Sequence, residues 1–407
     1  MKEYQTGQIR NIALVSHNGA GTTSLVERIL FKTGAITRMG SVTTGTAHMD
    51  FEEEEIARNS SLAMAIAPVE WQGVKLNLLD TPGFLDFVGE VNAAMKVADS
   101  AAVMLDAVAG VEVGTEAVWA AADAYDRPRV LVVNKMDREN VRVRRVKESI
   151  ANNLEGHFVD LQLPIGEGPT FTGVVDLLHM EARLGEKGDK GAIPADMAAT
   201  VAEARAALVE AAAEGDDELI MKYLEGEELS GAEVIRGLKE SLLRGAVIPV
   251  LYCAGETGLG VDALLDAFVD LLPAPNENGG FEATDGAGQT ATYDVSDASP
   301  LVVFVFKSRE DNFGKTSYLR IFGGALSSDS RIWDGVRNAE VRVGTLQIPS
   351  GKDTSPVGKL HAGDIGTVVK LGEAATNDTL GDRGKTCLLY TSPSPRDRTR
   401  SRMPSSA

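Results

Sequence analysis

The sequence predicts two structural units: an α/β domain built on a mostly parallel sheet with helices on both faces, followed by a small all-β barrel domain. Through about residue 272, short apolar runs alternate with helix-like stretches, a pattern that favours a largely parallel sheet covered on both sides. From Leu301 onward the pattern changes to short strand-like runs divided by Gly-rich turns, which is typical of a barrel. With 407 residues, the chain is also too long for one ordinary core.

Composition excludes several classes of protein. Apolar residues make up 43% of the chain and charged residues 24%, which is ordinary for a globular protein and unlike a disordered or collagen-like one. No apolar run reaches about 18 residues, so we expect no transmembrane helix and no membrane partner. The polar N-terminus lacks the apolar centre of a signal peptide. Two cysteines, Cys253 and Cys387, cannot form a disulfide framework, so we expect a cytoplasmic location.

The charge is distributed unevenly along the chain. The formal net charge is −19, and the acidic excess falls in residues 1–300. No basic stripe of the kind that binds nucleic acid is visible there, so we expect no DNA partner. Solubility is the ordinary interpretation of the acidity.

The first domain is predicted to span residues 1–275. Its expected strands lie at 11–15, 75–79, 101–105, 130–133 and 246–253, and its expected helices at 24–31, 86–98, 115–125 and 261–272. Ligands of such sheets bind at the loops that follow the carboxyl ends of the strands.

The middle of this domain differs from the rest. We interpret residues from about 150 to 246 as an inserted helical subdomain, with helices at 195–215 and 230–244 and a small strand element at 171–177. Residues 276–299 are rich in Gly, Pro, Asn and Asp and predict a linker. The barrel would occupy 300–386, with strands at 301–307, 315–322, 331–333, 340–347 and 365–370.

Residues 387–407 do not fit either domain. They have no hydrophobic periodicity, and the segment from Cys387 to Asp397 matches one reading frame of a common transposon-type sequencing adapter. We therefore interpret 387–407 as a read-through scar that is not native. The alternative is a genuine basic tail. Without the scar, Cys387 leaves the cysteine count, and the chain is expected to be a fragment of a longer protein.

A candidate phosphate-binding loop follows the first expected strand. Such a loop has the form G-x-x-x-x-G-K-[ST] between a strand and a helix. Its backbone N–H groups and the helix N-terminus attract phosphate oxygens. Ser16 and Thr22 depart from the pattern at the first Gly and at the Lys, so an ordinary strand–helix turn is an equal interpretation of this segment alone. The candidate residues are Ser16, His17, Asn18, Gly19, Ala20, Gly21, Thr22, Thr23 and Ser24.

Two further motifs each follow an expected strand, which makes coincidence improbable. Asp80, Thr81, Pro82 and Gly83 fit a carboxylate near Mg²⁺ and a Gly N–H that faces a γ-phosphate. In the second motif, Asp137 can accept hydrogen bonds from both the ring N–H and the amine of guanine. Adenine offers no such pair of donors. A dinucleotide-binding dehydrogenase fits poorly, because no G-x-G-x-x-G with a downstream ribose carboxylate is present. The second motif is Asn134, Lys135, Met136 and Asp137.

With these motifs the sequence resembles translational GTPases of the elongation factor G type, and more closely the elongation factor G-like branch. The resemblance runs from about Gln8 to Thr386 and is carried by LNLLDTPGFLDFVGEV, VVNKMDREN, FTGVVDL and HAGDIGTVV. It implies a P-loop GTPase domain with an insert and a β-barrel second domain. It also implies GTP/GDP and Mg²⁺ as cofactors, the ribosome as partner and a monomer. The family's further C-terminal domains are absent here, so the resemblance implies a C-terminally truncated fragment.

The resemblance also assigns roles to residues. Residues 16–23 match the phosphate loop, with Thr22 at the Lys position and Thr23 at the Mg²⁺-binding position. Residues 46–62 match the first switch, where Ser61 stands for the family's Mg²⁺-binding Thr and where we expect the acidic run 52–55 to be a solvated or mobile segment. Asp80 and Gly83 match the second switch. Asn134, Lys135 and Asp137 match the guanine motif. Ala254 and Gly255 fall where the family usually has Ser-Ala, so the resemblance implies that the last base contact is made by backbone amides.

Two departures from the family leave the activity open. Phe84 occupies the position of the family's catalytic His and can neither donate nor accept a hydrogen bond, so no catalytic residue is assigned. Thr22 removes one of the main charges that stabilise phosphoryl transfer, a loss of about 3–5 kcal/mol if its partner stays buried. A Lys codon becomes a Thr codon by one base change, so an error in the sequence is an alternative explanation for Thr22. The two hypotheses are a GTP-hydrolysing translation factor and a GTP-binding pseudoenzyme that regulates or associates with ribosomes.

Overall fold

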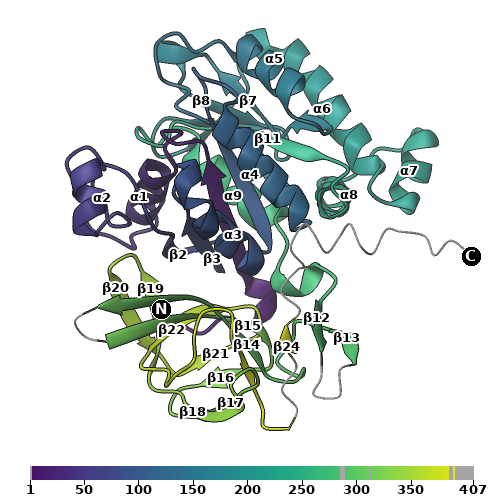
Figure 1. Ribbon diagram of the computed structural model, residues 1–407. Coiled ribbons are helices and arrows are strands. Elements are labelled where there is room, and N and C mark those ends of the chain that lie inside the picture. Colours follow the sequence, from purple (N-terminus) through teal and green to yellow (C-terminus); the bar gives the residue numbers. More distant parts are fainter. Residues whose placement is uncertain (1, 285–288, 312–313, 385–387, 390–407) are drawn as a thin grey trace, which may run out of the picture.

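The computed structural model describes residues 2–284, 289–311, 314–384 and 388–389. Its first domain is built on a seven-stranded sheet in the order β2-β3-β1-β4-β5-β11-β6 (Figure 1). Edge strand β2 runs antiparallel to β3, and the other neighbours are parallel. The strands are β1 Ile9–Ser16, β2 Ala65–Trp71, β3 Val74–Asp80, β4 Ser100–Asp106, β5 Arg129–Asn134, β6 Phe158–Asp160 and β11 Ile248–Tyr252.

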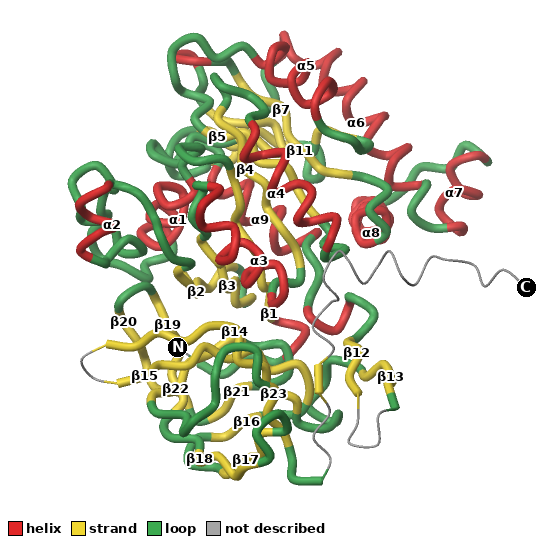
Figure 2. The backbone as a smooth tube through the Cα atoms, in the orientation of Figure 1, coloured by secondary structure: helices red, strands yellow, loops and turns green. Residues whose placement is uncertain are grey.

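Helices cover both faces of this sheet, as Figure 2 shows, which confirms the predicted α/β class. One apolar core holds side chains of α1, α6, α8 and α9, and a second holds those of α3, α4 and α5. The sheet strands are buried on both faces because they lie between these two cores. The helices are α1 Thr22–Lys32, α3 Val88–Val97, α4 Val113–Ala124, α5 Val143–Asn153, α6 Ala198–Ala213, α8 Gly231–Leu243 and α9 Val261–Leu271.

The predicted motifs meet at one edge of the sheet because parallel strands end there together. Asp106, at the end of β4, is paired in register with Asn134 at the end of β5, and Leu14 in β1 is paired with Asp80 at the end of β3. Strand β1 ends at Ser16 and α1 begins at Thr22, so the loop between them consists of residues 17–21. The candidate phosphate loop and the two later motifs therefore share this edge.

The inserted segment contains more strand than the sequence predicts. Its β6 joins the edge of the central sheet, and β7, β8, β9 and β10 form a separate antiparallel sheet in the order β10-β9-β8-β7. Where the sequence predicts one small strand element at 171–177, the structure has β8 inside this sheet. The strands are β7 Gln162–Ile165, β8 Gly173–Asp176, β9 Glu181–Leu184 and β10 Asp189–Gly191, and a further helix is α7 Asp217–Leu224.

The segment predicted to be a linker also holds ordered structure. Strands β12 Phe281–Thr284 and β13 Thr290–Tyr293 pair antiparallel, and β24 Leu388–Leu389 adds to β12. The two residues of β24 belong to the segment 387–407 that we interpret as a scar, and the rest of that segment lies outside the described residues.

The second domain is an antiparallel sheet of eight strands in the order β18-β17-β23-β14-β15-β22-β19-β20, which surrounds one apolar core. The single strand predicted at 340–347 is two strands, β18 and β19, which lie toward opposite ends of the sheet. β18 pairs with β17, whereas β19 pairs with β20 and β22, and between β18 and β19 Val343 N donates to Ser330 O. The strands are β14 Val302–Asp311, β15 Gly314–Gly323, β17 Arg331–Asp334, β18 Ala339–Arg342, β19 Leu346–Ser350, β20 Asp353–Val357, β22 Ile365–Val369 and β23 Thr379–Gly381, with β16 Leu326–Ser327 and β21 Lys359–Leu360 paired beside them.

A buried polar network joins the two domains. Lys75 Nζ in β3 donates to Asp364 Oδ1 at 2.7 Å, and Arg320 in β15 forms an ion pair with Asp99 at 2.8 Å. Because these groups are almost fully buried, removing one partner would leave an uncompensated charge. Among the described residues, no helix is long and apolar enough to cross a membrane.

Candidate functional site

A cavity of about 380 Å³ opens where β1, β3 and β5 end, and it brings together most of the predicted site residues. The predicted residues that line it are Ser16, Asn18, Gly19, Gly21, Thr22, Thr23, Ser24, Ser61, Thr81, Gly83, Asn134 and Lys135.

The other predicted residues stand behind or beside the cavity. The Ala20 carbonyl accepts a hydrogen bond from Asn134 Nδ2 at 2.9 Å, and His17 Nδ1 accepts from Gly114 N at 3.1 Å. Met136 and Ala254 belong to the apolar core, and Phe84 is 43% exposed. The predicted residues outside the lining are His17, Ala20, Asp80, Pro82, Phe84, Met136, Asp137 and Ala254.

Two glycines of the site are required by close approach. Gly21 has a φ of 91°, and a Cβ there would lie 2.9 Å from Asn134 Nδ2. A Cβ on Gly83 would lie 2.6 Å from the Cα of Asn18. Both later motifs are therefore packed directly against the candidate phosphate loop.

One end of the cavity is formed by Asn134 and Lys135 of the expected guanine motif, and we call it the base end. Hydrogen bonds hold its side chains in place. Asn134 Oδ1 accepts from Gly255 N at 2.8 Å, so Asn134 joins the candidate phosphate loop to the loop after β11. Lys135 Nζ donates to the Gly19 carbonyl and, at 2.7 Å, to Asp106 Oδ2. Burial alone would raise the pKa of Asp106, but the hydrogen bond from Lys135 holds this pKa below its usual range. In the neighbouring loop, Asp137 Oδ2 accepts from Thr257 Oγ1 at 3.0 Å.

At the opposite end, which we call the phosphate end, the hydroxyls of Thr23 and Ser61 meet the carboxylates of Asp50 and Asp80. Thr23 Oγ1 lies 3.1 Å from Ser61 Oγ, and Ser61 Oγ donates to Asp50 Oδ1 at 2.7 Å. Both Asp80 oxygens are buried and have no hydrogen-bond partner among the described residues, and the same is true of Asp50 Oδ2.

Burial controls the protonation of these two carboxylates. Burial, reinforced by the charge of Asp50, raises the pKa of Asp80 to about 8. The nearby hydroxyls of Thr23 and Thr22 lower this pKa in part, although neither makes a hydrogen bond of normal geometry to Asp80. Burial also raises the pKa of Asp50 to about 6. Both carboxylates therefore sit where a cation would stabilise the ionised form.

This donor set fits Mg²⁺. Adjacent ligands of an octahedral ion with metal–oxygen bonds of about 2.1 Å lie about 3.0 Å apart, which is close to the Thr23–Ser61 separation of 3.1 Å. The buried carboxylates supply the negative charge that Mg²⁺ prefers. When bound, the ion would neutralise phosphate charge.

The candidate phosphate loop, residues 16–24, brings no cation to the phosphate end of the cavity. Thr22 is buried where the loop pattern places Lys, its hydroxyl lies near the Asp80 carboxylate, and Glu27 and Asp50 line the same cavity. Lys135 and Arg138 are the cations among the described lining residues. The residues therefore fit a metal ion better than they fit a γ-phosphate without one.

The acidic run 52–55 is not wholly solvated. Helix α2 spans Glu53–Arg58, and Glu55 is buried, where its Oε1 accepts from Leu62 N at 3.0 Å and Ala63 N at 3.2 Å. The expectation of a solvated or mobile acidic run is therefore wrong for Glu55. Two of the hydrogen bonds to Glu55 come from residues beyond the run, Leu62 and Ala63, and no count of local charge reveals them. The third comes from Glu52 N inside the run, at 3.2 Å.

Sequence reasoning missed several residues around the cavity. Glu27 in α1 accepts from Gly40 N at 2.7 Å and His48 N at 2.9 Å, so it ties the helix to the segment before α2. Glu27 lies four residues after Thr23, one helical turn along the same face, and that spacing is the signal that could have found it. The lining residues that the sequence did not single out are Glu27, 39–43, Arg138 and Glu256, together with Asp50, Asn59 and Ser60 inside the range 46–62 matched to the first switch.

The barrel contacts the segments that border the cavity. Arg309 in β14 forms an ion pair with Glu52 at 2.6 Å and lies over the Phe51 ring at 4.7 Å. Lys307 donates to Glu90 Oε2 and to the Met64 carbonyl, both at 2.8 Å. A movement of the segment 46–62 would therefore alter contacts made by the barrel.

Comparison with known proteins identifies both domains. Residues 7–274 match the elongation factor Tu GTP binding domain, and residues 300–383 match elongation factor G domain 2. A crystal structure of a protein from Thermus thermophilus is similar at 33% sequence identity, with a TM-score of 0.83. The match covers 92% of this chain and 54% of that one, so this chain spans about half the length of that structure.

Proposed function

Since the chain belongs to the family of the elongation factor Tu GTP binding domain, we propose that it is a GTP-binding translation factor of the elongation factor G type. In this proposal it binds GTP or GDP with Mg²⁺, hydrolyses GTP and acts on the ribosome as a conformational switch. The elongation factor G domain 2 match over 300–383 supports the elongation factor G type. The proposal includes a cytoplasmic location and the predicted domains, 1–275 for GTP binding and 300–386 for the barrel.

One observation supports guanine recognition. Asn134 and Lys135 are each hydrogen-bonded to the loop of residues 16–24, and Asp137 follows them along the same edge of the cavity, which we call the rim. The rim thereby positions a carboxylate beside the cavity, where it can accept from the two donors of guanine. Thr23, Ser61, Asp50 and Asp80 would hold Mg²⁺ at the other end.

The residues of the chain suggest how the GTP-bound and GDP-bound states would differ. The γ-phosphate would draw Ser61 and Gly83 toward the loop, and its loss would release the segment 46–62. Because Arg309 contacts that segment and Lys307 contacts α3, the barrel would respond to the release.

A second candidate function is a GTP-binding factor with little hydrolysis. Two observations favour it: Thr22 brings no charge to the phosphate end, and Phe84 brings no hydrogen-bonding group to the position of the family's catalytic His. Turnover measured with ribosomes separates the two candidates. A rate equal to that in buffer, together with tight guanine-nucleotide binding, would exclude the hydrolysing factor.

Calorimetry tests the shared part of the proposal. GTP and GDP should bind with Mg²⁺, ATP should bind far more weakly, and removal of Mg²⁺ with a chelator should weaken GTP binding. Equal uptake of ATP and GTP, or no binding at micromolar concentration, would contradict both candidates.

A further inference from the structure

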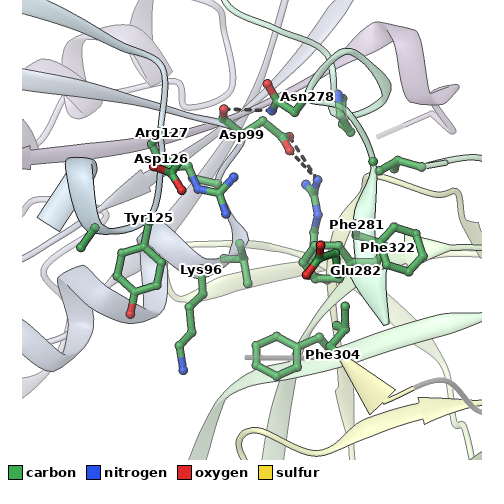
Figure 3. A pocket seen from close by; sticks show the side chains of 18 residues that line it. Lys96, Asp99, Tyr125, Asp126, Arg127, Asn278, Phe281, Glu282, Phe304 and Phe322 are labelled. Atoms are coloured by element: carbon green, nitrogen blue, oxygen red, sulfur yellow. Dashed lines mark hydrogen bonds and ion pairs between the residues drawn. The ribbon is translucent and has the colours of Figure 1, made fainter. Parts of the chain in front are cut away.

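A second cavity, of about 570 Å³, lies between the first domain, the segment after α9 and the barrel (Figure 3). It is lined by the end of α3, the turn before β5, the segment from Pro275 to Glu282, and strands β14 and β15, and Leu389 completes one edge. None of its described lining residues belongs to the nucleotide cavity. The two cavities are therefore separate sites.

Two cations of this cavity, Arg127 and Lys96, have no carboxylate bonded to them among the described residues. Arg127 donates from Nε to the Met95 carbonyl at 2.9 Å, and among the described residues no hydrogen bond is made by its terminal nitrogens. Lys96 likewise has no ion pair within the described part of the chain. Burial lowers the pKa of Arg127, as expected for a guanidinium without full compensation.

Against the lowering by burial, the charge of Asp99 raises the pKa of Arg127 in part, but the Asp99 carboxylate is hydrogen-bonded to other residues. Asp99 accepts from Arg320 at 2.8 and 3.1 Å and from Asn11 Nδ2 at 2.6 Å. In Figure 3 the Arg127 side chain points into the cavity, while Asp99 is drawn bonded elsewhere. Asp126 and Glu282 also line the cavity, and their charges disfavour a ligand with several negative charges.

Aromatic rings form the opposite wall. The Phe281 and Phe322 centroids lie 5.7 Å apart, and those of Phe304 and Phe322 lie 6.4 Å apart. Phe281 and Phe304 are almost fully buried. Such a wall favours a flat apolar body, and the volume is within the usual range for small-molecule sites.

We propose that this interdomain cavity binds a small aromatic monoanion, with its carboxylate or sulfonate at Arg127 and Lys96 and its rings against Phe281 and Phe304. Three separate parts of the chain would contact the ligand at once. The bound state would therefore favour the arrangement of first domain and barrel seen here.

Fluorescence titration of the full chain with 8-anilinonaphthalene-1-sulfonate tests the proposal. Arg127→Gln should weaken binding of this probe about tenfold or more, and Lys96→Gln should weaken it less. Arg127→Lys keeps the charge and should retain most of the affinity. Arg144→Gln, an exposed change of the same charge on α5, is the matched control and should have no effect.

A neutral probe and a competitor make the result specific. N-phenyl-1-naphthylamine has the same rings without the sulfonate, so Arg127→Gln should leave its binding unchanged. Circular dichroism of each variant shows whether it is folded. Equal sulfonate binding to folded Arg127→Gln, displacement of the probe by GTP, or no probe binding at all would each overturn the proposal.

Discussion

The two ends of the nucleotide cavity differ in how completely their polar groups are bonded. At the base end, Asn134 and Lys135 each contact two partners or more, and Asp137 accepts from Thr257. At the phosphate end, the Asp80 carboxylate is buried without a hydrogen-bond partner among the described residues. The fold alone therefore completes the base end, whereas the phosphate end needs a cation to complete it.

This difference has an energetic consequence. A buried carboxylate without a partner is costly when ionised, and the raised pKa of Asp80, about 8, reflects that cost. A metal ion bound there would remove the cost, so its binding would stabilise the folded chain. The base end should gain much less from ligand binding, because its groups are bonded already.

The largest expected effect comes from adding charge to the phosphate end. Thr22→Lys should increase GTP affinity about 10²–10³-fold, because the new ammonium would face phosphate oxygens and the nearby carboxylates. Thr22→Gln, which adds length without charge, is the control. Calorimetry measures both, and an affinity equal to that of the unmodified chain would show that Thr22 does not limit binding.

The second prediction concerns pH. The pKa of Asp80 is about 8 in the folded chain, above the ordinary value of 3.8, so the folded state keeps a proton that the unfolded state loses. Stability without ligands should therefore fall as pH rises from about 4 to 8, by about 3–4 kcal/mol between pH 5 and 8 from this group. Asp80→Asn should remove most of that slope.

Urea denaturation at several pH values measures the slope. Asp50, with a pKa of about 6, adds a smaller contribution of the same sign. Asp196→Asn, an exposed change of the same kind, should leave the slope unchanged. A slope that persists in Asp80→Asn would mean that Asp80 is ionised in the folded chain across this range.

The third prediction tests the base end. Asp137→Asn should reduce the preference for GTP over ATP about 10- to 100-fold, because one charged acceptor is lost. Folding should change little, since the hydrogen bond to Thr257 is exposed. Competition between the two nucleotides measures the preference, and an unchanged ratio would contradict guanine recognition at this rim.

The same comparison shows what sequence can predict. The three motifs are predictable because each is local and each follows a strand, and the pairing of Asp106 with Asn134 brings strand ends to one edge. The roles of Glu55 and Glu27 are not predictable in this way. Apart from Glu52, three residues before Glu55, their partners lie 7 to 21 residues away and depend on how the chain turns between them. Long-range hydrogen bonds are set by tertiary packing, which leaves no local pattern.

The fold is predictable to a similar degree. Alternation of strands and helices indicates the parallel sheet, yet it does not reveal the small strands of the insert or the hairpin β12–β13. The run 340–347 is predicted as one strand because its composition suits a strand throughout. Only the pairing of β18 with β17 and of β19 with β20 and β22 divides it.

The smallest expected effect lies at the outer side of the phosphate end, where the barrel meets the segment 46–62. Arg309→Gln removes the ion pair to Glu52 and the contact over Phe51, both partly exposed, so the loss should be below about 1 kcal/mol. Hydrogen exchange of residues 46–62 should become a few times faster, and the base end should be unaffected. Arg342→Gln, an exposed change in β18, is the control. Equal exchange in both variants would mean that Arg309 does not hold this segment.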